Sequence, residues 1–321
     1  MIWSQKLLRG ALMAASLAAT VVSGPSWAQD YPNKPITILV PFGAGGATDV
    51  TTRLIADIAG EKLGQRVIVE NRPGAGGGLM AADLAQAEPD GYTLGALTAS
   101  PILVRPHTVP DAGYDSSKDF TFIARYLLAP QPIAVAADSP WNTYQDMIAW
   151  AKENPGRLRY TAIAQLGGAH VVIERAFRQE GVKAVHIPFN NGPEAITAFR
   201  GGNLDMVAQS DYAVLLDNGE IKILAETGPE RLPTAPDAPT FRELGYDVSP
   251  AIFYGIGGPA GLPPEIVERW ETMVREATET EEFKGLLAQL KMIPAYLPSE
   301  EFRKAALADY ELIGEAVKQI Q

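Results

Sequence analysis

Short apolar runs alternate with longer amphipathic stretches along most of the chain. Residues 36–40 (ITILV) form a continuous apolar run, which predicts a buried strand. A loop of small residues follows, and apolar residues then recur at helical spacing. This spacing predicts a helix with Thr48 or Asp49 as N-cap and Gly64 at its end. The apolar face of this helix would comprise Val50, Leu54, Ile55, Ile58 and Leu63.

The same alternation continues up to residue 100. The segment RVIVEN (66–71) predicts a second strand, closed by the turn-rich RPGAGGG (72–78). LMAADLAQA (79–87) predicts a short helix, and YTLGALTAS (92–100) predicts a third strand that ends at Ser100 and Pro101.

A second block begins at PIAVAAD (132–138) and repeats this order. TYQDMIAWAKENPG predicts a helix that stops at residues 154–156. Residues 157–181 then predict a strand, a small-residue loop at Gln165–Ala169, and a helix with Val172, Ile173 and Phe177 facing inward. VKAVHIPF, ITAFRGGNLDMVAQS and EIKILAET continue the block, a proline-rich surface loop is expected at 228–245, and amphipathic helices are predicted for 261–280, 281–290 and 299–320.

This order predicts an α/β fold with two lobes, each a mainly parallel sheet flanked by helices, and a cleft between them. The two strand-loop-helix units are about 120 positions apart and would each present a loop and a helix start to the cleft. Because the tail is helical and the middle block is self-contained, lobe 1 is expected to comprise residues 29–129 and 250–321, and lobe 2 residues 130–249. The two crossings would form a hinge.

The first 28 residues have the features of a secretory signal peptide. Lys6 and Arg9 precede the apolar run ALMAASLAATVV, and SWA before Gln29 resembles a cleavage site. The alternative is a membrane anchor, but the run is shorter than the roughly 20 apolar residues that span a bilayer. An exported protein is therefore expected, with residues 1–28 removed.

Charge and cysteine content indicate the expected compartment and the classes of partner that are disfavoured. The chain has no cysteine, so the exported protein would have neither disulfides nor a lipid-bearing thiol, which favours a soluble periplasmic protein. Removing residues 1–28 takes away two basic residues and no acid, and changes the formal net charge from −11 to −13. This charge disfavours nucleic acid and anionic lipid as partners.

The loop GAGGATD (43–49) has three possible uses. It lacks the Lys and Ser/Thr of a P-loop, and the dinucleotide pattern fails because Thr48 stands where the last glycine is needed. A looser match at Gly76, Gly78 and Ala81 does not follow a strand directly. A carboxylate is the second possibility, since bare backbone N–H groups at a helix start, with about +0.5 charge, bind anions. A plain tight turn is the third.

The sequence offers little for catalysis. The three histidines, His107, His170 and His186, have no metal-binding spacing, and neither Ser100 nor Ser210 lies in a nucleophile elbow. We therefore expect no enzyme activity, no metal and no cofactor. Of the histidines, His170 is the candidate for a binding role, because it stands at the start of the helix after the second loop.

Six stretches, in order along the chain after residue 28, carry a resemblance that extends over nearly all of it: YPNKPITILVPFGAGGATDVTTRLIA, LGQRVIVENRPGAGGGLMAADLA, EPDGYTLGALTAS, YDSSKDFTFIA, AVHIPFNNGPEAITAFRGGNLDMV and RLPTAPDAPTFRELGYDV. They resemble the solute-binding receptors of tripartite tricarboxylate transporters, also called Bug receptors. The resemblance implies a periplasmic two-lobed fold of the type II kind that closes on an organic carboxylate and serves membrane permease subunits.

The resemblance also implies a set of ligand-binding residues. In the first lobe, backbone amides and Thr48 would hold the carboxylate; the loop comprises Phe42, Gly43, Ala44, Gly45, Gly46, Ala47, Thr48 and Asp49. In the second lobe the corresponding residues are Gln165, Gly167, Gly168 and His170. Ser100 and Ser210 would face the cleft from its walls. For Asp49 the alternative is a helix cap that does not touch the ligand.

The chain departs from the family pattern at Asn190 and Asn191, where lysine and glycine are more usual, and at Gln165, Leu166 and Gly167. The identity of the ligand therefore cannot be taken over from other members of the family. A dicarboxylate, a tricarboxylate, an aromatic acid and an acidic amino acid are all compatible with the sequence. Transport by a monomer is the first hypothesis. The alternative is a periplasmic receptor that reports ligand occupancy to a signalling protein.

Overall fold

The computed structural model describes residues 31–246 and 250–318. The predicted signal peptide lies outside these described residues. Lys34–Gln321 form one compact unit. In the described ranges no helix has the length and apolar character that crossing a membrane requires.

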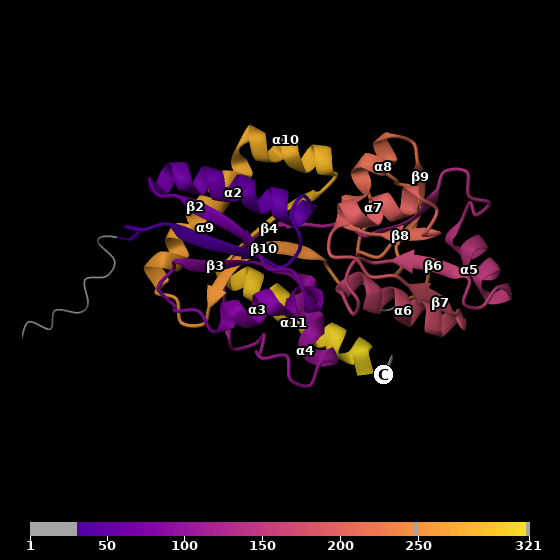
Figure 1. The fold of residues 1–321 in the computed structure, drawn as a ribbon, viewed down its shortest axis with the longest axis horizontal. Coiled ribbons are helices and arrows are strands. Elements are labelled where there is room, and N and C mark those ends of the chain that lie inside the picture. Colours follow the sequence, from indigo (N-terminus) through magenta and orange to yellow (C-terminus); the bar gives the residue numbers. More distant parts are fainter. Residues whose placement is uncertain (1–30, 247–249, 319–321) are drawn as a thin grey trace, which may run out of the picture. The chain divides into compact units, whose positions relative to one another are not determined.

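The larger of two sheets has six strands and is built from both ends of the chain (Figure 1). Its strands, in spatial order, are β11 (Ile293–Pro298), β4 (Phe120–Leu128), β10 (Phe253–Pro259), β3 (Thr93–Thr98), β1 (Ile36–Val40) and β2 (Val67–Asn71). The predicted strands at 36–40, 66–71 and 92–100 are thus present within one or two residues of their expected ends.

Helices lie on both sides of this sheet. On one side are α2 (Ala47–Leu63), α9 (Pro264–Glu279) and α10 (Glu281–Leu290), and on the other α3 (Gly78–Ala85), α4 (Arg105–Thr108) and α11 (Ser299–Lys318) (Figure 1). This sheet and these six helices are called the six-stranded half below. The side chain of Phe302 on α11 packs edge-on against Phe122 and Phe253, which joins the helix to β4 and β10.

The second sheet has five strands, all from the middle of the chain. In spatial order they are β7 (Ala184–His186), β6 (Leu158–Thr161), β8 (Met206–Ala208), β5 (Pro132–Ala136) and β9 (Ile221–Glu226). The flanking helices are α5 (Tyr144–Glu153), α6 (Gly168–Glu180), α7 (Gly192–Arg200) and α8 (Ala213–Asp217). This sheet and these four helices are called the five-stranded half.

The α/β fold with two helix-flanked sheets is confirmed, and both sheets are mixed. β1 is parallel to β2 and β3, and β6 is parallel to β7 and β8, as expected for strand-helix-strand units. β4 and β10 pair antiparallel, because one strand leads away from the six-stranded half and the other returns to it. The N–H of Ala129 donates to the carbonyl of Ile252 (2.7 Å), so the outgoing and returning segments lie side by side.

The start of α2 differs from its prediction. Gly46, and not Thr48 or Asp49, is the N-cap residue, and it has no side chain with which to cap. Asp49 stands at the third helical position, where its carboxylate Oδ2 accepts a hydrogen bond from the N–H of Gly45 (2.9 Å). The cap is thus supplied from inside the helix. The predicted end at Gly64 is confirmed, with φ of 63°.

The central strand β10 contains glycines where neighbouring atoms leave no room for a side chain. A Cβ atom at Gly257 would lie 2.7 Å from the carbonyl oxygen of Thr121 on β4 and 2.4 Å from Cδ1 of Leu97. The Thr121 oxygen belongs to the backbone of a paired strand, so it cannot move aside cheaply.

Gly257→Ala is therefore expected to lower the free energy of unfolding by about 2 kcal/mol, as overpacking does in other cores. The measurement is urea unfolding followed by circular dichroism. The matched control is Gly285→Ala on α10, where a Cβ would have no neighbouring atom within 4 Å. This change should raise stability by about 0.5–1 kcal/mol. Equal effects of the two changes would contradict this account of β10.

Candidate functional site

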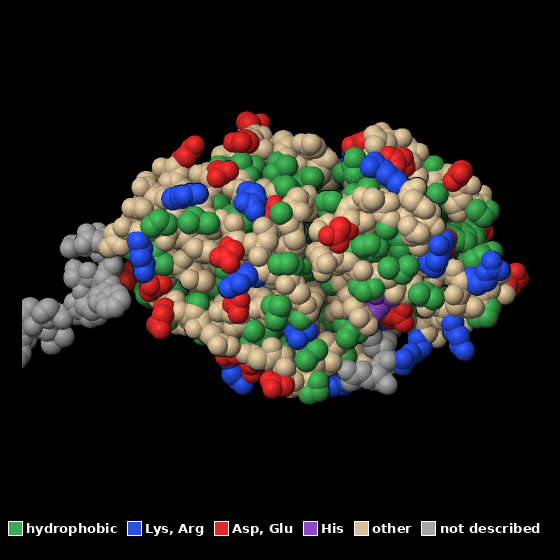
Figure 2. Space-filling view, viewed as in Figure 1, with side chains coloured by type: hydrophobic (Ala, Val, Ile, Leu, Met, Phe, Trp, Pro, Cys, Tyr) green, Lys and Arg blue, Asp and Glu red, His purple; other side chains and the backbone are tan. Residues whose placement is uncertain are grey.

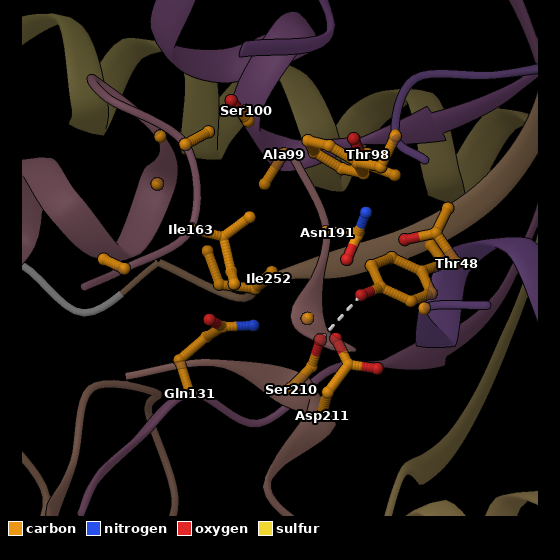
Figure 3. A pocket seen from close by; sticks show the side chains of 18 of the residues that line it. Thr48, Thr98, Ala99, Ser100, Gln131, Ile163, Asn191, Ser210, Asp211 and Ile252 are labelled. Carbon is orange, nitrogen blue, oxygen red and sulfur yellow. Dashed lines mark hydrogen bonds between the residues drawn. The ribbon is translucent and has the colours of Figure 1, made fainter. Parts of the chain in front are cut away.

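A pocket lies where the six-stranded and five-stranded halves meet, and it is called the inner pocket here (Figure 3). From the six-stranded half and its crossing segment it is lined by Phe42, Gly43, Gly46, Thr48, Asp49, Thr98, Ala99, Ser100, Ile252 and Tyr254. From the five-stranded half and its crossing segment it is lined by Gln131, Ala162, Ile163, Ala164, Gly167, Gly168, Asn191, Gly192, Ser210 and Asp211. The volume of the pocket is about 80 Å³. One water molecule needs roughly 10–15 Å³, so the pocket can hold several.

Two loop-helix units with nearly the same backbone border this pocket. The N-cap of α2, Gly46, has φ −81° and ψ 168°, and the N-cap of α6, Gly167, has φ −81° and ψ 170°. The residue before each cap has positive φ, 85° at Gly45 and 55° at Leu166. The predicted similarity of the two loops therefore extends to their backbone angles.

The third helical residue has the same role in both units. Asp49 accepts from the N–H of Gly45, and His170 Nδ1 accepts from the N–H of Leu166 (2.9 Å). Leu166 adopts a left-handed conformation, which is energetically unfavourable for a residue other than glycine. This side-chain cap from the third position holds each loop in the shape that exposes the following N–H groups to the pocket.

Two N–H groups at the loop before α2 already donate hydrogen bonds to acceptors within the protein. The N–H of Gly43 donates to the carbonyl of Asn190 (3.3 Å), and the N–H of Ala47 donates to Oδ1 of Asp211 (2.8 Å). Both acceptors belong to the five-stranded half. The N–H groups of Thr48 and Asp49 have no acceptor among the described residues, so they remain available at this helix start.

The carboxylate of Asp49 is engaged within its own half. It forms an ion pair with Arg53 (2.9 Å) and accepts from Nδ2 of Asn71 (2.9 Å). Burial alone would raise the pKa of Asp49, but the hydrogen bonds from Arg53, Gly45 and Asn71 hold it below its usual value. The capping role left open by the sequence agrees with these contacts.

The start of α6 has no competing acceptor. The N–H of Val171 makes the first intrahelical bond, to Gly167, and the N–H groups of Gly168, Ala169 and His170 have no acceptor in the described ranges. Burial, with the neighbouring His186 as a smaller cause, lowers the pKa of His170 to about 3. A neutral His170 keeps Nδ1 free to accept from Leu166.

Hydroxyl groups from both halves meet in the pocket. Ser210 Oγ and Tyr254 OH lie 2.8 Å apart, across the boundary of the two halves (Figure 3). Ser100 Oγ donates to the carbonyl of Gly76 (2.8 Å). The hydroxyl of Thr98, a residue only 2% exposed, has no hydrogen-bond partner among the described residues. An unpaired buried hydroxyl in a pocket wall indicates a place for a ligand or water atom.

A second, larger cavity borders the inner pocket and shares Phe42, Ser100 and Ala164 with it. The volume of this second cavity is about 430 Å³. Gln165 lines this outer pocket, as does Arg105, whose Nη1 donates to the carbonyl of Ala75 (3.0 Å).

The predicted site residues separate into two groups. The inner pocket is lined by Phe42, Gly43, Gly46, Thr48, Asp49, Ser100, Gly167, Gly168 and Ser210. Outside this lining are Ala44, Gly45, Ala47, Gln165 and His170. Gly45 and the side chain of His170 fix the backbone conformation of the two loops, and Ala47 donates its N–H to Asp211. These three residues therefore influence the shape of the pocket without lining it.

Several lining residues were not predicted, among them Thr98, Gln131, Ile252, Tyr254 and Asp211. Only Asp211 carried a signal that could have been noticed, as an acid within the apolar stretch MVAQSDYAVLL. The departures noted at residues 190 and 191 do reach the site. Asn191 caps α7, and its Nδ2 would lie 2.9 Å from a Cβ placed on Gly43.

No three His, Cys, Asp or Glu side chains of the described part are grouped so that they could hold a metal ion. On the face shown in Figure 2, acidic and basic side chains are interspersed, which gives no continuous basic footprint there. The site thus consists of main-chain N–H groups, hydroxyls, amides and one unpaired carboxylate.

Comparison with known proteins places this geometry in a family. The model of the tripartite tricarboxylate transporter family receptor matches residues 51–321. The chain belongs to this family. The receptor is also 34% identical over 303 residues to the "UPF0065 protein in gbd 5'region" of Cupriavidus necator, an alignment that covers 94% of this chain and 92% of that protein.

Solved structures of similar proteins share the fold of this receptor. The periplasmic binding protein BugD is 26% identical, with a TM-score of 0.80 over 90% of this chain and 98% of BugD. A Rhodopseudomonas palustris protein solved with adipate is 27% identical, with a TM-score of 0.81 over 91% and 98% of the two chains. MatC of the same organism, solved with malate, is 26% identical, with a TM-score of 0.80 over 91% and 100%. One of these structural relatives is thus a periplasmic binding protein, and the other two hold carboxylates.

Proposed function

We propose that the protein is a periplasmic solute-binding protein that captures a small organic carboxylate in the inner pocket and delivers it, unchanged, to a tripartite tricarboxylate-type membrane permease. The observation that carries this proposal is the pair of matching loop-helix units, α2 and α6, whose helix starts border one pocket. Family membership and the carboxylates held by the two Rhodopseudomonas relatives support it.

The chemistry follows from the helix starts. The N–H groups of Gly168, Ala169 and His170, with those of Thr48 and Asp49, would donate to the ligand carboxylate. Each such charge-assisted hydrogen bond is worth about 1.5–3 kcal/mol before desolvation is counted. The groups are fixed by the two loops before the ligand arrives, so binding costs little reorganisation.

The proposed lobes are residues 29–129 with 250–321, and residues 130–249, with the two crossing segments as the hinge. Closure of the lobes would exclude water and would let two weak half-sites act together. The ligand would leave when the lobes open at the permease. A cleaved signal peptide would bring the protein to the periplasm, the compartment named for BugD.

The test begins with mass spectrometry of small molecules that remain bound through purification. Thermal unfolding then compares dicarboxylates, citrate-like acids, aromatic acids and acidic amino acids. A true ligand at 100 times its Kd should stabilise the protein by about 2.7 kcal/mol and raise Tm accordingly. If no acid raises Tm, carboxylate binding is contradicted; if a bound acid is chemically altered on incubation, the protein is an enzyme.

The permease step needs its own measurement. Cells that lack this protein should lose uptake of the identified acid, and purified protein added to spheroplasts should restore it. Uptake that persists without the protein would contradict the transport role and would favour a receptor that only reports occupancy.

A further inference from the structure

Asp211 places a carboxylate in the wall of the inner pocket, in the short 3₁₀ turn Ser210–Tyr212 that follows β8. Its Oδ1 accepts from the N–H of Ala47, and the side chain lies over two glycines. A Cβ at Gly192 would lie 2.0 Å from Oδ2, and a Cβ at Gly46 would lie 3.8 Å from it. Glycine at 192 leaves room for the carboxylate, and at Gly46 a Cβ would only be in ordinary contact with it.

No positive side chain of the described residues forms an ion pair with this carboxylate. The lining of the inner pocket contains no Lys, Arg or His, and its other acid, Asp49, is already paired with Arg53. Asp211 forms no ion pair with any described residue. Burial raises the pKa of Asp211 to about 6, against the lowering effect of the hydrogen bond from Ala47. At neutral pH the charged carboxylate of Asp211 therefore has no positively charged partner among the described residues.

The two ends of the pocket differ as a result. At α2 the first helical N–H already holds the carboxylate of Asp211, whereas at α6 the N–H groups of Gly168 and Ala169 have no described acceptor. The hydroxyl of Thr98 in the same wall also has no hydrogen-bond partner among the described residues. The N–H groups that remain without an acceptor at the helix starts suit an anion, whereas the wall at Asp211 suits a hydrogen-bond donor with positive charge.

We propose that the ligand carries both a carboxylate and an ammonium group, and that Asp211 selects the ammonium. This inference rests on the proposed function, in which the helix starts hold the carboxylate. A second carboxylate placed beside Asp211 would meet a like charge in a pocket without a cation, whereas an ammonium group would supply the missing partner. The ligand would thus differ in kind from the dicarboxylates adipate and malate held by the two relatives.

The test is isothermal titration calorimetry at pH 7.5 with probes matched in carbon count. Succinate is compared with 4-aminobutanoate, glutarate with 5-aminopentanoate, and succinate with aspartate as an α-amino form. The wild-type protein is expected to bind the best amino acid at least about tenfold more tightly than the matched dicarboxylate. Asp211→Asn keeps an oxygen that can accept from Ala47, and it should weaken that amino acid about tenfold and strengthen the dicarboxylate.

The control is Asp217→Asn, which removes the same charge from an acid whose side chain is 57% exposed and paired with Lys291. It should leave both affinities unchanged. Tighter binding of dicarboxylates by the wild type, or equal effects of Asp211→Asn on both members of a pair, would overturn the inference and leave carboxylate binding intact. Absence of binding by every probe also overturns it; the aromatic and citrate-like acids then decide the proposed function separately.

Discussion

Gly168→Val is expected to lower the affinity for the bound acid by at least about 100-fold, close to complete loss of binding. Gly168 is the first residue of α6, and a Cβ there would lie 2.7 Å from Cδ1 of Ile252 and 3.7 Å from Cβ of Ala99. Valine would thus fill the space in front of the helix start. Losing two charge-assisted hydrogen bonds of about 1.5–3 kcal/mol each, about 3–6 kcal/mol together, gives at least this change in affinity.

The measurement is calorimetric titration with the panel acid that raises the wild-type Tm most. The matched control is Gly285→Val on α10, a helical glycine with open space around it, which should bind as the wild type does. Gly168 lies in a helix and its nearest contact is the end of a flexible side chain, so the unliganded variant should fold. Wild-type affinity in folded Gly168→Val would exclude the start of α6 from the site.

The sequence predicted the two loop-helix units well because each depends on local signals. A buried strand, a run of small residues and an apolar helix face follow one another at Ile36–Leu63 and again at Leu158–Glu180. Glycine at 46 and 167 marks each helix start. The capping residues were harder to predict, because a cap supplied from the third helical position, by Asp49 or His170, resembles a ligand contact in the sequence.

The central strand β10 was not predicted, because its sequence FYGIGGP lacks a regular apolar pattern. It is a strand because β3 and β4 pair with it on both sides, and its glycines fit the close backbone of β4. Tertiary packing overrides the low strand propensity of glycine here. The contributions of Thr98 and Tyr254 to the pocket follow from this pairing, so the sequence alone could not indicate them.

The role of Asp211 likewise depends on the meeting of the two halves. In the sequence it is separated from Ala47 by 164 positions, and only the fold brings its carboxylate to the start of α2. The prediction that this loop would use its N–H groups for a ligand took no account of an acceptor within the protein. A loop able to hold an external anion can equally hold an internal one.

Glu226 is another buried acid near the pocket, at the end of β9. Its Oε1 accepts from the N–H of Gln131 (3.0 Å) and from the N–H of Gly228 (2.8 Å). Its Oε2 has no partner among the described residues. Gln131 precedes β5, where the chain enters the five-stranded half, and also lines the inner pocket. Glu226 is therefore in direct contact with the segment between the two halves.

Stability is expected to fall by about 2–3 kcal/mol between pH 5 and pH 8 through Glu226 alone. Burial raises the pKa of Glu226 from 4.5 to about 7, although three backbone hydrogen bonds oppose this. In that window the folded state keeps a proton that the unfolded state has lost, so the free energy of unfolding decreases as the pH rises. The loss is complete above the folded pKa.

Glu226→Gln should remove this part of the pH dependence, since glutamine keeps an oxygen for Gln131 and Gly228 but does not titrate. Urea unfolding of both proteins from pH 5 to pH 8 gives the difference, in which the contributions of Asp211 and Asp309, whose pKa values are also raised, cancel. Glu282→Gln, on the exposed side of α10, controls for loss of a surface charge. If wild type and Glu226→Gln show parallel curves, Glu226 carries no unusual proton; if they diverge as expected, the folded protein holds at Glu226 a proton that the unfolded chain has released.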